Sequence, residues 1–251
     1  MKSPSTPAPW VCPWCGFFVG GNVGFGITTG TGISNSGTDT GAGGLGSAIA
    51  TGAIMSSADV NAQGFAGGGQ IGYNWEPIRD WIVGIEADAD ALSAKKTLTP
   101  APGFLAPAGT AGGGSLATIT YDREVDWVAT LRLKGGFSVM NNALFVYGTA
   151  GGAVAQFGLS DQFICPACTP TTASQPGTNV STKMTRFGGA IGAGLEWMVV
   201  PKVSVKAEVL YIEVGSSTNT ITYNYGGSTS SLTSTARDGL TILRGGLNWY
   251  F

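Results

Sequence analysis

The last residues of the chain alternate between two kinds of side chain. Leu243, Trp249 and Phe251 fall on one face of an extended strand, and Arg244 and Asn248 fall on the other. Alternation with a period of two indicates a β-strand, and similar alternation recurs in segment after segment of this chain. A closed barrel with an apolar outer face and a polar lumen satisfies all of these segments at once.

Composition narrows the class of protein. Glycine supplies 41 of the 251 residues and charged residues only 11%. The glycines follow no G-X-Y period, which excludes a collagen-like chain. No run of about 18 apolar residues occurs, so we expect no transmembrane helix. The net charge of −2 provides no basic surface, so nucleic acid is not an expected partner. The remaining classes are an apolar soluble β-protein and a membrane barrel.

The first residues differ from the rest of the chain. Residues 1–15 are rich in proline, contain a Cys12/Cys15 pair, and lack the apolar core of a signal peptide. We therefore predict a Pro-rich leader over 1–15 and one barrel domain over 16–251. If the protein is exported, we expect its signal peptide to have been removed and Met1 to be an addition.

Eight alternating segments rich in glycine, aromatic and β-branched residues can be placed along the chain. Short connections of turn-forming residues, such as Asn141-Asn142, alternate with long ones rich in Gly, Ser, Thr and Pro. This alternation predicts an all-β fold, an eight-stranded antiparallel transmembrane β-barrel with short periplasmic turns and long extracellular loops. The segments lie at about 16–27, 64–76, 81–92, 119–139, 143–157, 185–199, 203–214 and 240–251, and the long loops at about 28–63, 93–118, 158–184 and 215–239.

Aromatic residues gather at the ends of these segments. Tryptophans near the short-turn ends predict an aromatic girdle at one membrane interface, and aromatic residues near the long-loop ends predict a second. The alternative is that aromatic residues simply favour strands. The first girdle comprises Trp14, Trp75, Trp81, Trp197 and Trp249, and the second Phe25, Phe65, Tyr121, Phe157, Phe187 and Tyr211.

Charged residues fall on the face opposite the outward aromatic residues. A charge that faces lipid at the membrane midplane costs about 2–4 kcal/mol for Arg or Lys, so this face is predicted to line the lumen. An eight-stranded barrel has an interior just wide enough for side chains to fill, which favours a packed structural core over an open channel. The predicted lumen residues are Glu86, Asp88, Glu124, Asp126, Arg132, Lys134, Arg186, Glu196, Lys206, Glu208 and Arg244, with Asp90 on the same face as Asp88.

Several segments together resemble one family. The chain is similar to the alphaproteobacterial outer-membrane immunogenic proteins, the small OmpA-like "porin family" barrels. The order and spacing of the segments carry the likeness, which covers nearly all strands and little of the loops. The matching segments are 16–25, 68–75, 83–88, 126–136, 146–152, 205–211 and 243–251.

The resemblance implies a location and partners. It implies an eight-stranded barrel in the Gram-negative outer membrane, embedded in its lipid, with Phe251 as the terminal residue of the signal that the barrel-assembly machinery recognises. Family members are abundant surface antigens that stabilise the envelope, and some are described as porins or haem binders. Apart from the resemblance, apolar loop residues such as Ile54, Phe104 and Phe163 predict that the loops pack on each other or on an adjacent subunit, as lateral contacts or a homo-oligomer.

Two cysteine pairs depart from the family pattern. In the predicted topology Cys12 and Cys15 lie on the short-turn side and Cys165 and Cys168 on the long-loop side, with about 30 Å of hydrocarbon between them. Disulfides need Cα atoms about 4.4–6.8 Å apart, so the predicted disulfides are Cys12–Cys15 and Cys165–Cys168. The alternative is contact or metal sharing between neighbouring subunits.

No catalytic or cofactor site is predicted. The chain has no histidine, which removes Ser-His-Asp catalysis and the usual axial haem ligand. We therefore predict a non-catalytic, structural and surface-interaction protein whose loops 28–63, 93–118 and 158–184 contact neighbours, a host or ligands. The alternative is a narrow porin that passes ions or small solutes.

Overall fold

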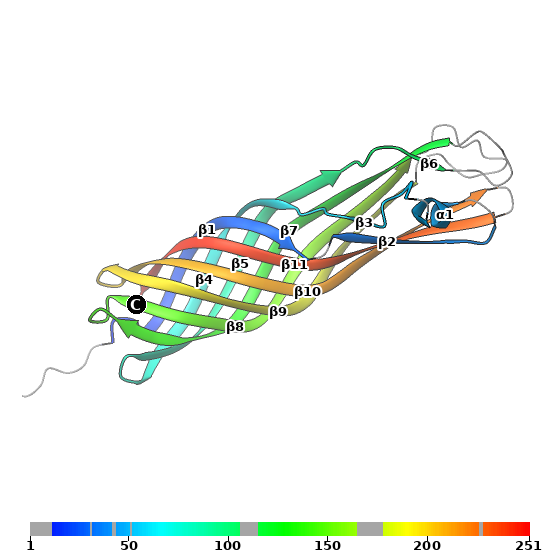
Figure 1. Ribbon diagram of the computed structural model, residues 1–251. Coiled ribbons are helices and arrows are strands. Elements are labelled where there is room, and N and C mark those ends of the chain that lie inside the picture. The colour runs from blue at the N-terminus through cyan, green and yellow to red at the C-terminus, as the bar shows by residue number, and fades with distance from the viewer. Residues whose placement is uncertain are drawn as a thin grey trace, which may run out of the picture.

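Long strands form a closed ring in the computed structural model, which describes residues 12–30, 32–41, 44–50, 52–105, 115–164, 178–225 and 228–251. Each long strand pairs antiparallel with its neighbours, and pairing of β1 with both β4 and β11 closes the ring (Figure 1). The predicted eight-stranded antiparallel barrel is therefore confirmed within this part of the chain. The ring runs through β1 (Gly16–Thr29), β4 (Gln63–Ile78), β5 (Trp81–Leu98), β7 (Ser115–Val139), β8 (Leu144–Ile164), β9 (Thr178–Val200), β10 (Val203–Tyr225) and β11 (Ser228–Tyr250).

The strands are longer than predicted. Much of the expected loops 158–184 and 215–239 is strand, because β8, β9, β10 and β11 continue into them. Ser and Thr in these segments indicated loops, but they pair across the β10/β11 hairpin, as the hydroxyls of Thr218 and Thr235 do at 3.2 Å. Thr is β-branched, and cross-strand Thr pairs stabilise a sheet.

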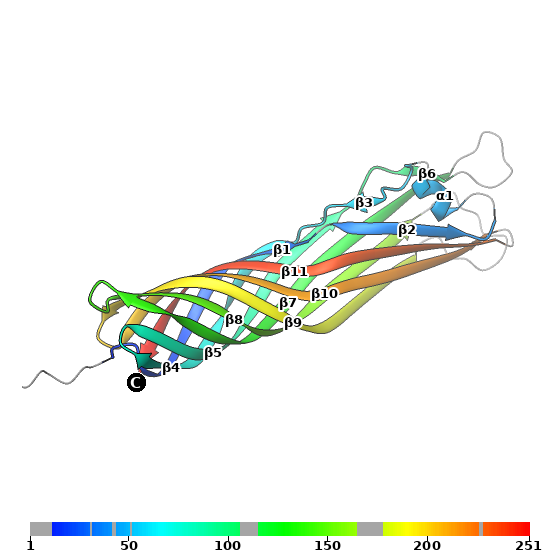
Figure 2. The ribbon, with the colours of Figure 1, turned by 60° about the horizontal axis from the view of Figure 1, so that its bottom comes forward.

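Shorter elements gather at one end of the barrel, which we call the outer end (Figure 2). There β2 (Ile33–Asp39) pairs with β11, β3 (Ser57–Ala58) pairs with β2, and β6 (Gly103–Leu105) pairs with β7. The single-turn helix α1 (Leu45–Ala50) lies against β2. No helix in the described ranges is long and apolar enough to cross a membrane.

The tight turns lie at the opposite end, which we call the short-turn end (Figure 1). They fall where predicted, between β4 and β5, β7 and β8, and β9 and β10. Asp80, Asn141, Asn142 and Lys202 adopt positive φ there, between 56° and 69°. Asn and Asp tolerate this left-handed conformation better than most residues, which explains their use in these connections.

The outer face of the barrel carries an apolar band. Large apolar side chains that point away from the lumen are exposed on many of the long strands, including Val23, Phe65, Ile85, Leu133, Phe187, Val209 and Leu243. Toward the outer end the band stops at charged residues on the same face, namely Lys95, Glu124, Asp126 and Lys183. An apolar band of this kind, with charges beyond it, is typical of a barrel that crosses a membrane.

The interior is filled in layers. Along β10 the inward residues change from Lys206 and Glu208 to Leu210 and Ile212, so a charged layer is followed by an apolar one. The aromatic layer at the short-turn end contains Trp14, Phe18, Phe145, Tyr147 and Tyr250. The apolar layer beyond the charges contains Leu92, Val125, Val128, Phe157, Leu210, Ile212, Leu240 and Ile242. A further apolar cluster fills the outer end, with Ile33, Leu45, Tyr121, Leu159, Phe163, Ile221 and Leu232.

A β-bulge in β7 reverses which residues face the lumen. The pairing of β7 with β8 shifts between Val125 and Trp127, so one extra residue lies on β7. Because side chains alternate with a period of two, such a shift moves every later residue to the other face. On the outer side of the bulge the inward residues are therefore Arg123 and Val125, and Glu124 points out. The continuous alternation predicted over 119–139 is wrong beyond this point.

Candidate functional site

The predicted lumen charges form a network inside the barrel, between the aromatic layer and the apolar layer. It brings together eight of the predicted lumen residues with Asp90, which sequence alternation had placed on the same face. All of their side chains are almost completely buried. The network consists of Glu86, Asp88 and Asp90 from β5, Arg132 and Lys134 from β7, Glu196 from β9, Lys206 and Glu208 from β10, and Arg244 from β11.

Two arginines link the carboxylates across the lumen. Arg132 donates from Nη2 to Glu86 and to Asp88, each at 2.7 Å, and from Nη1 to Glu208 at 3.0 Å. Arg244 donates from Nη1 to Asp88 at 2.9 Å and to Asp90 at 2.6 Å. Guanidinium groups suit such multiple contacts because their donors form a rigid planar fork. The two arginines therefore connect β5 to β10 through the interior.

Two lysines complete the network. Lys206 donates to Glu86 at 2.7 Å, and Lys134 donates to Glu196 at 2.7 Å. The ammonium group of Lys134 also lies 4.1 Å from the centre of the Tyr147 ring, close enough for a cation–π interaction. The aromatic layer therefore stabilises the charged layer as well as closing the short-turn end.

The network is packed and nearly neutral. Its described members are five carboxylates and four cations, and each cation contacts at least one carboxylate. A buried ion pair adds little stability over apolar packing, but removal of one partner leaves an uncompensated charge. Charges that are held this way cross-link strands, and their carboxylates are engaged rather than free for acid–base chemistry.

Three predicted lumen residues lie elsewhere. The predictions for Glu124 and Asp126 are wrong, because the bulge in β7 turns both to the outer face, where Lys183 contacts each of them. The contact with Lys183 lowers the pKa of Glu124. Arg186 does reach inward, but to Asp238 in a separate layer nearer the outer end, 3.4 Å away.

That separate layer contains residues that the sequence analysis missed. Arg123 and Asp238 are both buried and lie 3.5 Å apart, and Arg123 also donates to the backbone carbonyl of Arg237. Asp238 lies in a segment predicted to be a loop, and regular alternation over 119–139 would place Arg123 on the face opposite to Arg132 and Lys134. To find this pair, the sequence would have had to indicate the β-bulge near Val125, and nothing in the local sequence does so.

The prediction that Trp14 belongs to a membrane girdle is wrong. Its side chain is fully buried in the barrel mouth, where its ring packs edge-on against Tyr250 and its Nε1 donates to the Asn142 carbonyl at 3.1 Å. Cys12 and Cys15 form the predicted disulfide on either side of it. Trp14 therefore enters the lumen rather than the lipid, between the two bonded cysteines.

Two further cysteine predictions are metal sharing between neighbouring subunits and the second disulfide. Glu76 lies beside Cys12 and Cys15, but the disulfide engages both sulfur atoms, so the group offers a metal only a carboxylate. Cys165 and Cys168 lie outside the described residues.

The other predicted girdle residues fall into two groups, those exposed on the outer face and those buried inside the barrel. Trp75, Trp81, Trp197 and Trp249 are all exposed on the outer face near the short-turn end, where a girdle would lie. On the far side Phe25, Phe65, Phe187 and Tyr211 are exposed. Tyr121 and Phe157 are buried, so their assignment to the second girdle is wrong. Tyr121 faces inward because of the β7 bulge.

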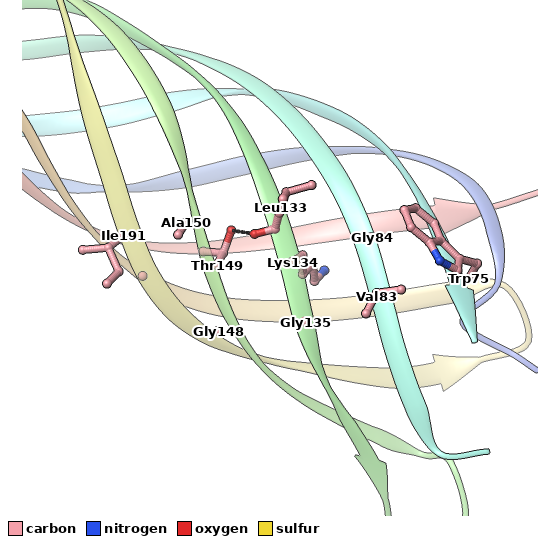
Figure 3. A pocket seen from close by; sticks show the side chains of 11 residues that line it. Trp75, Val83, Gly84, Leu133, Lys134, Gly135, Gly148, Thr149, Ala150 and Ile191 are labelled. Carbon is pink, nitrogen blue, oxygen red and sulfur yellow. Dashed lines mark hydrogen bonds between the residues drawn. The ribbon is translucent and has the colours of Figure 1, made fainter. Parts of the chain in front are cut away.

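A shallow groove of about 640 Å³ crosses the outer face over β5, β7, β8 and β9 (Figure 3). Glycines create it, since a Cβ on Gly135 would meet no atom within 4 Å. Leu133 and Ile191 project beside it and Thr149 donates to the Leu133 carbonyl at 2.8 Å. The groove lies within the apolar band, where Leu133 and Ile191 are exposed.

Phe251 ends the chain at the short-turn end. Its backbone nitrogen donates to the Phe17 carbonyl at 2.9 Å and its side chain is exposed. Its role as the last residue of an assembly signal stays a prediction.

Comparison with known proteins gives consistent matches. A family model described as outer membrane protein beta-barrel domain matches residues 16–236. The 31 kDa outer-membrane immunogenic proteins of Brucella melitensis and Brucella suis are each 28% identical over 166 residues, which are 64% of this chain and 59% of those proteins. The chain thus spans less than two thirds of the length of these relatives. Among solved structures, OprG from Pseudomonas aeruginosa is 13% identical, with a TM-score of 0.46 and 94% of this chain and 97% of that chain covered. Neisserial surface protein A is also 13% identical, with a TM-score of 0.40 and the same coverage.

Proposed function

This chain belongs to the outer membrane protein β-barrel domain family and resides in the outer membrane, and we propose that it serves there as a non-catalytic barrel with a structural and surface-interaction role. The packed lumen supports the structural role, and the protruding outer end supports the surface-interaction role.

The observation that best supports a structural role is that side chains fill the lumen continuously. Ions would have to pass the Trp14 and Tyr147 layer, the charged network, and then the apolar layer around Val128 and Leu210. Nearly every side chain in these layers is buried. The charges bind one another, which supports a closed barrel over the alternative of a narrow pore.

The outer end supports the interaction part. Strands β10 and β11 continue beyond the apolar band, which ends near Tyr211 and Leu243, as far as Tyr225 and Ser228. They carry β2 and α1 at their tip (Figure 2). This places a folded surface well above the membrane, where neighbours or host molecules can reach it. The name immunogenic protein, which the Brucella relatives carry, fits a protein exposed at such a surface.

A non-catalytic role is supported by the side chains available. The carboxylates of the network are engaged by Arg132, Lys134, Lys206 and Arg244. Histidine, the commonest general base, is absent from the chain.

Conductance of the purified, folded barrel in a planar bilayer tests the closed-lumen proposal. We expect no reproducible current steps at high salt, with folding verified by heat-modifiable gel mobility and bilayer quality verified by an unrelated open porin. Unitary steps whose ion selectivity changes in Arg132→Gln or Lys134→Gln would establish the narrow pore instead. A variant in which Glu86, Arg132 and Lys134 are all neutralised is the positive control. Loss of these contacts should open the charged network and raise the leak current.

The structural role is tested in cells. Loss of the protein should raise outer-membrane permeability to a large hydrophobic dye, and the wild type should restore the barrier. A variant in which a short Gly-Ser turn replaces residues 40–52 keeps the barrel but removes α1, so it should restore the barrier while it loses surface contacts. If the deletion strain shows no permeability change, the structural role is refuted.

A further inference from the structure

The outer end is built from two sheets that are joined incompletely. Backbone pairing of β9 with β10 stops at Gly189 and Glu213. Beyond that point, within the described residues, β9 pairs only with β8 and the rest of β10 only with β11. The two sheets separate along this seam (Figure 1). Side chains in the interior, rather than backbone hydrogen bonds, therefore have to hold them together there.

Asn219 shows one such contact across the seam. From β10 its Nδ2 donates to the carbonyl of Leu159 on β8 at 3.0 Å and approaches the carbonyl of Val180 on β9 at 3.4 Å. Its side chain is buried. The interior face of the β8/β9 sheet thus contacts β10 directly at this level.

Asp161 lies in the same interior layer. It projects from β8 with no exposed surface, and neither carboxylate oxygen receives a hydrogen bond from any described residue. Apolar side chains of the outer cluster, including Leu159 and Phe163 on its own strand, surround this level of the barrel. Ser234 on β11 and Asn219 on β10 are polar side chains near enough to favour the charged form of the carboxyl, but neither makes a hydrogen bond to it.

Among the residues that the structure describes, no base faces Asp161 from the elements packed around it. On β7 the titratable group is Tyr121, whose pKa burial raises to about 12, so it stays neutral. Arg123 on β7 and Arg186 on β9 belong to the neighbouring layer, where both contact Asp238 on β11. The inward polar groups of β2, β10 and β11 at this level are uncharged, namely Asn35, Ser217, Asn219 and Ser234.

A buried carboxylate without a counter-charge favours the protonated form. Burial raises the pKa of Asp161 from 3.8 to about 6, and the interactions with Ser234 and Asn219 only partly oppose this effect. When the sheets part and water enters, the carboxyl regains its ordinary pKa. Because the closed state has the higher pKa, closure is most favourable at low pH, weakens as the pH rises above about 4, and reaches its minimum above about 6.

We propose that Asp161 is a proton-controlled latch, whose protonated side chain keeps the two sheets of the outer end closed in acidic medium and whose ionisation loosens them in neutral medium. The ligand is a proton, and the bistable element is the seam between β9 and β10. This inference does not depend on what the outer end binds or on whether the lumen conducts.

Hydrogen–deuterium exchange on the folded barrel in lipid nanodiscs tests the latch. Protection factors, corrected for the intrinsic pH dependence of exchange, are compared at pH 5 and pH 7.5 for peptides that cover 157–163 and 216–222. A pKa of about 6 in the closed state and 3.8 in the open state predicts about tenfold higher protection at pH 5. Transmembrane peptides from β1 and β4 provide the internal reference and should not change.

Three variants make the test specific. Asp161→Asn keeps the shape but cannot ionise, so the pH difference should vanish, with protection at pH 7.5 at or above that of the wild type. Ser234→Ala removes a group that favours the charged form, so the midpoint should move to higher pH. Asp122→Asn, an exposed acid on the adjacent strand, is the matched control and should retain the full difference.

Two results would overturn the proposal. An unchanged pH difference in Asp161→Asn would assign the effect to another group. Protection that responds to millimolar calcium but not to pH would make the carboxyl a cation ligand instead of a latch.

Discussion

Arg244 and Glu208 occupy directly opposed positions on β11 and β10, and Arg244 donates to one oxygen, Oε2, from both Nε at 2.9 Å and Nη2 at 2.7 Å. Both side chains are buried. Charge-assisted hydrogen bonds of this length are among the strongest that side chains form. This pair therefore joins the last two strands from inside the lumen.

Loss of the Arg244 charge should destabilise the barrel strongly. Arg244→Met removes one of the four cations that balance the buried carboxylates of the network and takes the cation away from Asp90, which should cost about 3–5 kcal/mol. Urea-induced unfolding in lipid vesicles measures the change. Arg244→Lys, which keeps the charge but loses the planar fork, should give a smaller loss. Arg237→Met, an exposed position on the same strand, is the control and should change stability by no more than about 0.5 kcal/mol.

Two adjacent glycines should respond oppositely to the same methyl group. A Cβ on Gly136 would lie 2.0 Å from the Val146 carbonyl oxygen, whereas a Cβ on Gly135 would meet nothing within 4 Å. Gly136→Ala should therefore cost at least about 1–3 kcal/mol through forced strand separation, and Gly135→Ala should be tolerated. The fraction that folds into vesicles measures both. Equal folding of the two variants would contradict the close approach of the Val146 carbonyl to Gly136.

The buried Trp14 side chain should matter more than the disulfide beside it. Trp14→Ala removes a fully buried ring and should cost about 3–5 kcal/mol. The ring closed by Cys12 and Cys15 is so short that the double Cys→Ser variant should cost no more than about 2 kcal/mol. The midpoint of unfolding, measured for both under the same conditions, ranks them. The reverse order would mean that the disulfide, not the indole, anchors this segment.

The ion pairs on the outer face should contribute little. Glu124 contacts Lys183 and Lys95, and the hydrogen bond from Lys183 is the main cause of its lowered pKa. A lowered pKa gives stability that is present above about pH 4.5 and lost as the pH falls further. Lys183→Met should cost less than about 1 kcal/mol, and the cost should shrink at high salt. Lys206→Met, which breaks a buried contact with Glu86, is the comparison and should cost several times more.

Much of the membrane-spanning part could be predicted from sequence. Inside the apolar band each strand has one face in lipid and one in the lumen. Where the lumen layer is charged, a period of two identifies inward residues such as Glu86, Arg132 and Lys206 directly. The alternation fails at Val125, where the bulge adds a residue to β7, because nothing in local composition distinguishes a bulged strand from a regular one. Beyond the band, water lies outside, and the polar residues of β10 and β11 no longer separate strand from loop.

The order of apolar and polar residues by itself determined the closed barrel, its strand sequence, its short turns and the charges that fill its lumen, because hydrocarbon tolerates no other arrangement of those side chains. Only the tertiary structure decided the inward turn of Trp14, the outward turn of Glu124 and Asp126, and the burial of Asp161 between two partly joined sheets. These features depend on register and on contacts between residues far apart in the chain, such as the one between Trp14 and Asn142. A local sequence pattern contains no information about register or about such long-range contacts.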